Sequence, residues 1–394
     1  MSTPHAIDNI PGLKNIKGIC YSPAPSDDTL PPAPSKFFDT DFTNSCFPLL
    51  WDEKNSGRGD VKNLAKIGVN FMHLYNWSVP PAPGSEPGNH QRSHSTFLKK
   101  CGDEGINVFV PISNYFLEQI NSGGGTSSTV KTQIAAMVDE AYNGGTTPYG
   151  GAAMWGVGNE YDLAPSSQFG VSDVVKAMEY LVEAEASQGI GTSDLLPVTS
   201  PVSFAVLPGA TGPGIEGVQA LKTAIEASTK LGSAFWKSRF VASTNPNNDG
   251  AFISNYISNT FPTAFPDTYF FFSEMGIDIK SGTTVTTDKE QAAFVLSQLN
   301  NSAPSGKFLG RCVFQFLDQT AMKTGSQATF GMNKFSTTHT SGTIKPSTYV
   351  PGGGENYNVD VLTQKAMYAS VKTTYAPSST TELNEKSASA QLLK

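Results

Sequence analysis

The sequence lacks clusters of lysine and arginine. Its 394 residues carry 27 Lys and Arg against 34 Asp and Glu, which gives a formal net charge of −7. A nucleic-acid-binding surface needs clustered cations to neutralise phosphates. The charge balance therefore excludes nucleic acid as an expected partner and leaves neutral polymers as candidate ligands.

Long apolar runs are also missing. No stretch reaches the roughly 18 apolar residues of a membrane-spanning helix, so we expect no membrane partner. The start, Met1 to His5, lacks the charged and then apolar layout of a secretory signal. We expect a soluble monomer, and the compartment stays open between the cytoplasm and secretion with a removed signal.

Cysteine and histidine are scarce. The cysteines lie far apart and in no CxxC arrangement, which argues against a zinc knuckle or a redox pair. We expect them to be reduced and structural. The sequence leaves open whether any two of them form a disulfide. The four are Cys20, Cys46, Cys101 and Cys312.

His90 and His94 have the i, i+4 spacing of a helical ligand pair, but the sequence offers no third ligand beside them. We therefore expect these histidines on a solvated surface rather than in a metal site. The glycine runs at 123–125 and 352–354 lack the lysine and the strand–helix context of a phosphate-binding loop. We therefore expect neither a metal nor a cofactor.

What the sequence does contain is a regular alternation of strand and helix patterns. Hydrophobic residues make up 38% and aromatic residues 10%, which supports a sizeable buried core. Alternating strands and helices are typical of parallel βαβ units. The eight predicted strands are Ile16–Ser22, Asn70–Trp77, Asn107–Ser113, Ala153–Glu160, Leu195–Pro201, Phe240–Asn245, Tyr269–Glu274 and Arg311–Leu317.

Helical patterns accompany these strands. They cover Asp60–Ile67, Ser95–Glu104, Val130–Asn143, Val171–Gln188, Ile215–Thr229, Asp249–Thr260, Asp288–Asn300 and Val361–Tyr375. Eight strand–helix pairs predict an α/β fold, a (β/α)8 TIM barrel in a single domain over residues 1–376. The polar residues 377–394 predict a disordered tail. Two insertions, Pro23–Gly59 and Thr320–Gly354, are expected to form long loops that shape a substrate cleft.

Two glutamates follow strongly apolar strands. Glu160 ends the fourth predicted strand and Glu274 the seventh. A carboxylate directly after a buried run is costly unless it faces a polar site. One such glutamate would more often begin a loop and form a salt bridge. Two of them, with Asn159 beside the first, favour glycosidic cleavage, which needs a proton donor and a carboxylate that attacks the anomeric carbon.

The ordered series of motifs resembles the clan A retaining glycosidases. It is most similar to glycoside hydrolase family 17, the β-1,3-glucanases, with the family 72 glucan transferases as near relatives. The resemblance spans about Lys17 to Phe335. Its motifs are GICY at 18–21, GVNFMHLY at 68–75, GINV at 105–108, GNE at 158–160, FSEMG at 272–276, and VFQFLDQ at 313–319 followed by Lys323.

The resemblance implies a role for each matching residue. Glu160 corresponds to the acid/base, Glu274 to the nucleophile and Asn159 to the amide that binds the sugar 2-hydroxyl. These roles require Glu274 to be ionised and Glu160 protonated at the working pH, with carboxyl oxygens about 5–5.5 Å apart. Asp318 and Lys323 correspond to residues that support the acid/base region.

Aromatic residues of the first two strands complete the predicted substrate site. Tyr75 corresponds to an aromatic near the cleaved sugar, Tyr21 lies in the strand-one motif, and Trp77 is placed to stack on a sugar. The chain departs from the family at His73, where an arginine is usual, and this predicts weaker or pH-sensitive support of the nucleophile. Residues 243–247 lack the usual tyrosine, and the first insertion is longer than expected.

The sequence thus predicts a retaining glycoside hydrolase that cleaves a β-linked glucan, with β-1,3-glucan favoured, by double displacement. Its partner is an oligo- or polysaccharide, held in an open groove with Tyr75, Trp77 and Tyr115 near the strand ends. Two alternatives stay open: a transglycosylase that uses the same glutamates, and a carbohydrate-binding barrel without catalysis. A metal-dependent barrel hydrolase would need several His and Asp residues at strand ends, and only His73 lies there.

Overall fold

The computed structural model describes residues 4–10, 12–26, 41–45, 47–77, 93–123, 127–163, 168–204, 212–280, 282–320, 323–343 and 356–376. Parts of both predicted insertions, Cys46, His90, the glycines at 352–354 and the predicted tail 377–394 lie outside these residues.

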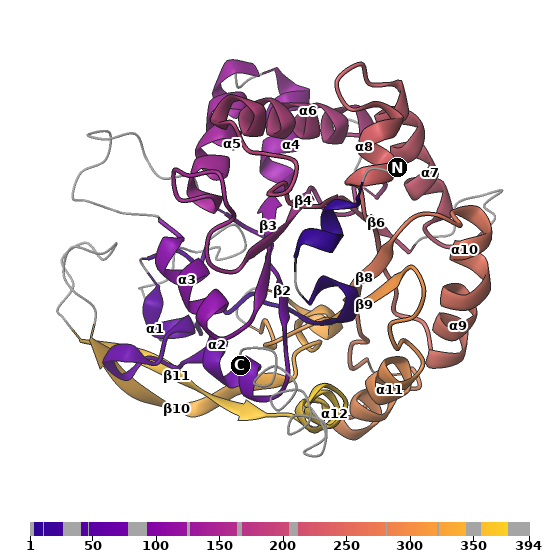
Figure 1. Cartoon of the computed structure of the whole chain (residues 1–394). Coiled ribbons are helices and arrows are strands. Elements are labelled where there is room, and N and C mark those ends of the chain that lie inside the picture. The colour runs from indigo at the N-terminus through magenta and orange to yellow at the C-terminus, as the bar shows by residue number, and fades with distance from the viewer. Residues whose placement is uncertain are drawn as a thin grey trace, which may run out of the picture.

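Parallel strands form a nearly closed barrel in the order β5-β4-β3-β2-β1-β9-β8-β7-β6 (Figure 1). The strands β5 (Val198–Thr199) and β6 (Pro201–Ser203) are two halves of one barrel strand, because β4 pairs with the first and β7 with the second. The eight-stranded barrel predicted from the sequence is therefore confirmed. The other strands are β1 (Ile16–Cys20), β2 (Phe71–His73), β3 (Asn107–Ile112), β4 (Ala152–Val157), β7 (Ala242–Asn245), β8 (Phe270–Met275) and β9 (Phe308–Val313).

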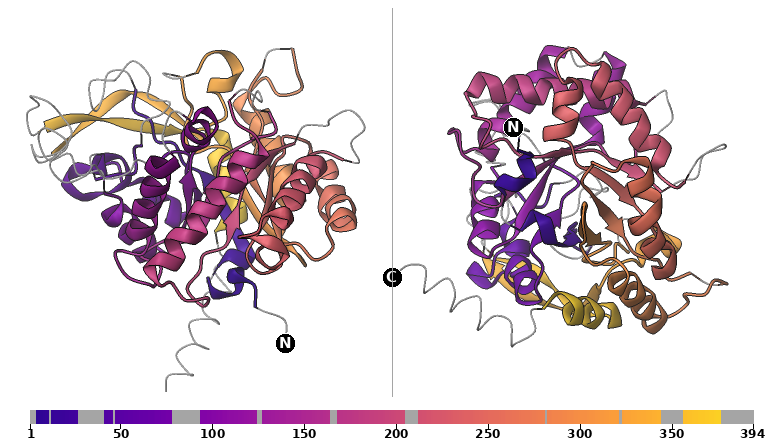
Figure 2. Two further views of the ribbon diagram at one scale, coloured as in Figure 1. Left: turned by 90° about the horizontal axis from the view of Figure 1, so that it is seen from above. Right: turned by 45° about the vertical axis from the view of Figure 1, so that its right-hand side comes forward.

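Helices surround the strands in all three views (Figures 1 and 2). The predicted helical patterns correspond to α2 (Asp60–Lys66), α3 (Ser95–Asp103), α5 (Ser127–Ala141), α6 (Val171–Gln188), α7 (Ile215–Ala227), α9 (Gly250–Asn255) with η5 (Tyr256–Thr260), α11 (Asp288–Asn300) and α12 (Ala366–Tyr375). Further helices are α1 (Pro48–Trp51), α4 (Asn114–Ser122), α8 (Gly232–Ser238) and α10 (Phe261–Ala264). Within the described ranges, none of these helices is long and apolar enough to cross a membrane.

The C-terminal segment differs from the sequence prediction. Val361–Tyr375 was expected to be one helix, but β11 covers Asn356–Gln364 and only the rest is helical. This strand pairs antiparallel with β10 (Asn333–Thr343), inside the insertion predicted as a loop. The alternation of Tyr357, Val359 and Val361 with polar residues is the period of a strand. The hairpin lies at the end of the barrel opposite the N-terminus (Figure 2).

Side chains fill the barrel interior. Phe71 and Phe271 meet edge to face from opposite sides with ring centroids 6.0 Å apart, and they share a buried cluster with Phe109 and Met154. Ile7 and Leu13, from the short helices η1 (Ala6–Asn9) and η2 (Leu13–Asn15), close this cluster at the N-terminal end of the strands. The opposite end of the barrel is left for polar groups, which is where barrel enzymes carry their sites.

The interior packing predicts a large effect of Gly156→Ala. An added Cβ would lie 1.7 Å from the ring of Phe109, so the ring has to leave its position in the core. We expect a loss of about 1–3 kcal/mol or more in the free energy of unfolding, measured by chemical denaturation. Gly170→Ala is the control, because its added Cβ meets nothing within 4 Å. Equal stabilities of the two variants would contradict the packing described.

Candidate active site

The turn after β4 presents Glu160. Every residue of β4 is buried, whereas Asn159 and Glu160 are partly exposed. The turn begins at Gly158 with φ 67°, and Glu160 itself has φ 52°, which residues other than glycine rarely adopt. The Glu160 amide donates to the carbonyl of Pro201 at 2.8 Å. Strained backbone of this kind persists where the surroundings hold it, and it gathers at functional sites.

A bulge at the end of β8 presents Glu274. Phe272 and Met275 pair with Arg311 and Val313 of β9, so three steps on β8 face two on β9. A bulge of this kind re-aims side chains, and here it lets two consecutive residues, Ser273 and Glu274, both hydrogen-bond into the mouth of the barrel.

Two amides join the glutamates. Asn159 Nδ2 donates to Glu274 Oε1 at 3.2 Å, and Asn245 Nδ2 donates to Glu160 Oε1 at 2.9 Å. Asn245 Nδ2 also reaches Asn159 Oδ1 at 3.3 Å. The structure thus brings Glu160, Glu274 and Asn159 together at the carboxyl ends of the strands. The predicted separation of the two carboxyl groups stays a prediction.

The Glu274 side chain is only partly exposed, and this changes its acidity. Burial raises its pKa to about 8, and the nearby charge of Glu160 adds to the rise. The Tyr75 hydroxyl, Lys323 and the Asn159 amide oppose it. The raised pKa of Glu274 therefore opposes the ionised state expected for a nucleophile. The desolvation of the carboxylate outweighs the donors that face it.

The pKa of Glu160 is also raised, chiefly by burial. The hydrogen bond from Asn245 opposes this rise, Asp162 adds to it, and Lys323 opposes it. Both glutamates are thus poorer acids than in water, so the pair holds at least one proton near neutral pH.

His73 lies beneath Tyr75 and is 1% exposed. Its Nδ1 donates to the carbonyl of Ser273 at 2.8 Å, and its ring stacks on Tyr75 with centroids 4.6 Å apart. Burial lowers the pKa of His73 to about 4, so it stays neutral and does not supply pH-sensitive support near neutrality. The Tyr75 hydroxyl makes no hydrogen bond of normal geometry, and it acts on the pKa of Glu274 from close by.

Lys323 and Asp318, predicted to act together, have different surroundings in the structure. The Lys323 ammonium lies 5.6 Å from the ring centre of Phe314, and its charge acts on the pKa values of both glutamates. Its predicted support of the acid/base region stays a prediction. Asp318 instead accepts from Lys365 Nζ at 3.1 Å and from the Gly331 amide at 2.7 Å. Its carboxyl ties the loop after β9 to the start of α12, and nothing in these contacts supports a role toward substrate.

The prediction that Tyr21 contacts substrate is wrong. Tyr21 is 2% exposed and belongs to the core between the strands and the helices. Its hydroxyl donates to Asp60 Oδ2 at 2.9 Å, and Arg58 binds the same carboxylate. Its position directly after β1 carries the side chain outward, under the helices, instead of into the mouth of the barrel.

The prediction that Trp77 stacks on a sugar is also wrong, since its ring is buried at 2% exposure. It stacks on His94 with centroids 3.6 Å apart and donates through Nε1 to Glu140 Oε2 at 3.1 Å. His94, expected on the surface, is fully buried between Asp41 and Glu140. In the described part of the chain no group of three His, Cys, Asp or Glu side chains is arranged to hold a metal ion.

This cluster predicts a pH-dependent stability. Burial alone would lower the pKa of His94, but Asp41 and Glu140 raise it to about 9. Because the folded pKa exceeds the unfolded value, the contribution is fully present below about pH 6.5 and is lost as the pH rises through about 9. We expect a loss of about 3 kcal/mol in the free energy of unfolding over this window.

The measurement is chemical denaturation of the wild type and of His94→Asn at pH 6 and pH 9.5. Subtracting the variant removes the titration of the other groups. Parallel losses of stability in the two proteins would show that His94 is not held between the acids as described.

Sequence reasoning missed two asparagines. Asn245 is described above, and Asn114 clamps Asn159: its Oδ1 accepts from the Asn159 amide at 2.7 Å, and its Nδ2 donates to the Asn159 carbonyl at 3.0 Å. Each lies at or just after the carboxyl end of a barrel strand. That position was the available signal, but asparagine after a strand is also a common turn residue.

Exposed apolar side chains gather on the same end of the barrel. Among the described residues, the large hydrophobic side chains that are exposed are Tyr115 at 58%, Leu163 at 57% and Phe252 at 40%. They follow β3, β4 and β7 in the chain. Phe204, which follows β6, meets Phe252 edge to face at 6.0 Å.

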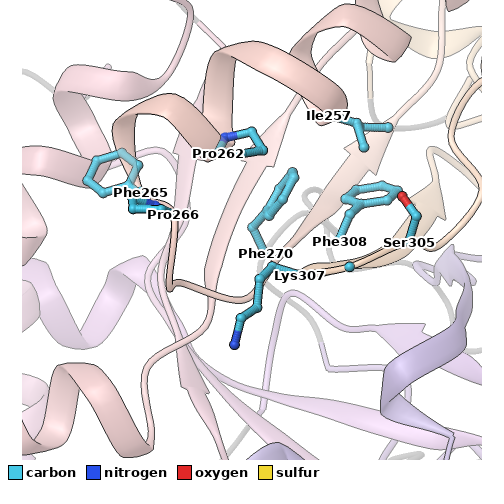
Figure 3. A pocket seen from close by; sticks show the side chains of 9 residues that line it. Ile257, Pro262, Phe265, Pro266, Phe270, Ser305, Lys307 and Phe308 are labelled. Atoms are coloured by element: carbon cyan, nitrogen blue, oxygen red, sulfur yellow. The ribbon is translucent and has the colours of Figure 1, made fainter.

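A cavity of about 240 Å³ lies at the other end, where Phe270 and Phe308 begin β8 and β9 (Figure 3). Ile257 and Pro262 lie across from these rings, and Lys307 points away from them (Figure 3). Since this is the amino-terminal end of the strands, the cavity is separate from the two glutamates.

No protein-family model matches the sequence, and no curated protein does either. Solved structures do resemble it. The Saccharomyces cerevisiae protein Gas2p in complex with laminaripentaose is 14% identical with a TM-score of 0.55, covering 92% of this chain and 64% of that one. The β-1,3-glucanase and allergen of Cryptomeria japonica pollen is 14% identical with a TM-score of 0.51, covering 81% and 95%.

A β-galacturonidase from Eisenbergiella tayi is 13% identical with a TM-score of 0.49, covering 92% of this chain and 51% of that one. The chain thus spans about half the length of that relative. The (β/α)8 barrel predicted from the sequence is thus also the fold of the Gas2p and pollen glucanase structures.

Proposed function

We propose that this chain is a retaining glycoside hydrolase that acts on a β-linked glucan, with β-1,3-glucan favoured. The observation that carries the proposal is the pair Glu160 and Glu274, which come from barrel strands four and seven and are joined through two amides. A proton donor and a nucleophile at one barrel mouth are what glycosidic cleavage requires. The catalytic domain is proposed to extend over residues 1–376.

The reaction proceeds in two displacements. Glu274 attacks the anomeric carbon while Glu160 gives its proton to the leaving oxygen, so a glycosyl ester forms and the glycosidic bond breaks. Glu160 then takes a proton from water, whose oxygen attacks the same carbon and releases Glu274. Asn159 lies beside Glu274, where its amide can bind the sugar 2-hydroxyl.

The first displacement needs the proton of the pair on Glu160. In the free site burial raises the pKa of Glu274 and so disfavours the ionised nucleophile. Tyr75, Lys323 and Asn159 all favour ionised Glu274, and a bound sugar places its glycosidic oxygen beside Glu160 as a proton acceptor. Glucan binding is therefore proposed to favour ionised Glu274 and protonated Glu160.

The substrate class is supported by the structures that share the fold. One of them is a β-1,3-glucanase, and another holds laminaripentaose. A barrel that only binds carbohydrate would not need two glutamates with matched donors, so catalysis is favoured. Hydrolysis and glycosyl transfer use the same glutamates and differ only in whether water or a sugar hydroxyl meets the glycosyl ester.

Product analysis tests this function. The full chain is incubated with a panel of β-1,3-, β-1,4-, β-1,6- and mixed-linkage glucans, and the products are separated by size. Shorter β-1,3-oligosaccharides alone would indicate hydrolysis, and products longer than the starting oligosaccharide would indicate transfer. No cleavage of any member of the panel would contradict the proposal.

Tyr115 predicts a dependence on chain length. Its ring is exposed beside the strand ends, so it can stack on a sugar that lies beyond the cleaved bond. We expect Tyr115→Ala to lower kcat/KM on a long oligosaccharide by about tenfold and to leave an aryl monoglycoside nearly unchanged. Tyr115→Phe is the control, because it keeps the ring. Equal losses on both substrates, or no gain in kcat/KM with length in the wild type, would contradict an open groove and favour exo action.

A further inference from the structure

Asn245 ends β7 and lies between the two glutamates, 9% exposed. All the polar atoms of its amide are engaged. Its Oδ1 accepts from Ser273 Oγ at 2.7 Å, and its Nδ2 donates to Glu160 Oε1 at 2.9 Å and to Asn159 Oδ1 at 3.3 Å.

These bonds fix which way the amide points. An ionised carboxylate only accepts, so the NH₂ group has to face Glu160. The oxygen then faces Ser273, whose hydroxyl can donate. Since Asn159 Oδ1 accepts from Asn245, the Nδ2 of Asn159 is left to donate to Glu274 Oε1. The orientation of one asparagine therefore sets the orientation of the other.

The hydrogen bonds form a closed circuit. It begins at Ser273, runs through Asn245 and Asn159, and returns to Glu274, the next residue after Ser273 on β8. Glu160 accepts a hydrogen bond from Asn245, the second residue of this series. The links measure 2.7, 3.3 and 3.2 Å, and Ser273 is fully buried, so we expect a change at one link to be transmitted to the others.

We propose that Asn245 is the positioning residue that aligns Glu160 with Glu274, and that Ser273 fixes the direction of its amide. The proposal deepens the proposed function and rests on it. Asn245 bonds Glu160 directly and reaches Glu274 only through Asn159, so it is a positioning residue and not a catalytic one.

The charges that face Glu160 come from Asp162, Lys323 and Glu274. Asn245 is the neutral donor that acts beside them, and its bond lowers the pKa of Glu160 against the effect of burial. Removing that bond, with the charges left in place, has a defined consequence: the Glu160 carboxyl becomes a weaker acid.

The first test measures this carboxyl directly. Carbon-13 NMR of glutamate-labelled protein follows the titration of Glu160, assigned as the resonance missing from Glu160→Gln. We expect Asn245→Ala to weaken the acid dissociation of Glu160 about tenfold. Ser273→Ala keeps the donor but frees the amide to turn, so it should shift the titration in the same direction by less, and it carries the test where Asn245→Ala does not fold.

Ser243→Ala is the matched control. Ser243 is also fully buried on β7, and its hydroxyl bonds Thr199 at 2.7 Å. It should lower stability without moving the titration of Glu160. An unchanged titration in folded Asn245→Ala, or the same shift in Ser243→Ala, would overturn the positioning role.

The second test is kinetic. A misplaced acid lowers the rate most for substrates with poor leaving groups. The aryl group of an activated glycoside departs without being protonated, so its cleavage depends little on the acid. We expect Asn245→Ala to lower kcat/KM on a β-1,3-oligosaccharide at least about tenfold more than on a dinitrophenyl glycoside. Equal losses on both substrates would overturn the proposal. A chain that cleaves no glucan but shows the NMR shift would instead overturn the proposed function and leave the effect of Asn245 on Glu160 standing.

Discussion

Glu160→Ala and Glu274→Ala are each expected to lower kcat/KM on unactivated β-glucan by on the order of 10³-fold or more, because each removes one of the two groups that act on the glycosidic bond. Initial rates on a β-1,3-oligosaccharide measure the loss. Glu290→Ala, which removes an exposed glutamate on α11, is the control and should retain full activity.

Azide distinguishes the two roles. With an activated aryl β-glycoside, azide takes the place of the lost Glu274 and gives the α-glycosyl azide. In Glu160→Ala it instead attacks the glycosyl ester on Glu274 and gives the β-glycosyl azide. Proton NMR of the products identifies each anomer. The same anomer from both variants would refute the assignment of acid/base and nucleophile.

The wild-type activity is expected to fall steeply above pH 8. Burial and the charge of Glu160 raise the pKa of Glu274 to about 8, so this is where the pair loses its last proton. Above it both carboxyls are ionised and no acid remains for the leaving oxygen. We therefore expect kcat/KM to decline about tenfold for each further pH unit. A profile that stays flat up to about pH 9.5 would contradict a coupled pair.

Glu160→Gln supplies the matched variant for the pH profile. It removes the charge that raises the pKa of Glu274, so the carboxylate nucleophile becomes available at lower pH. On an activated aryl glycoside, which needs no acid, the acid side of its profile should move below the wild-type position. An acid side that does not move would show that burial and not the charge of Glu160 controls the nucleophile.

The parts of the fold and of the candidate site that could be predicted from the sequence are those that depend on burial. Glu160 and Glu274 were predictable because an ionisable group directly after a fully buried strand demands a site. Lys323 was placed by resemblance, and the structure brings it near both glutamates. The barrel was predictable because its strands and helices differ in hydrophobic period.

The errors have a common origin in side-chain direction. Tyr21 directly follows β1, but β2 ends at His73, four residues before Trp77. Whether an aromatic ring points into the mouth or under the helices depends on strand register, which composition does not reveal. Asn245 and Asn114 were missed because an asparagine carries no burial signal until its partners are known. The β10 strand was missed because its residues are almost all polar, so its pairing with β11 left no apolar period to find.

The stereochemistry of the first product tests the central claim most directly. A β-1,3-oligosaccharide is cleaved with the full chain, and proton NMR follows the anomer released in the first minutes, before mutarotation. Glu160 and Glu274 acting as acid and nucleophile predict the β anomer, because two displacements restore the configuration. The α anomer as first product would contradict the account.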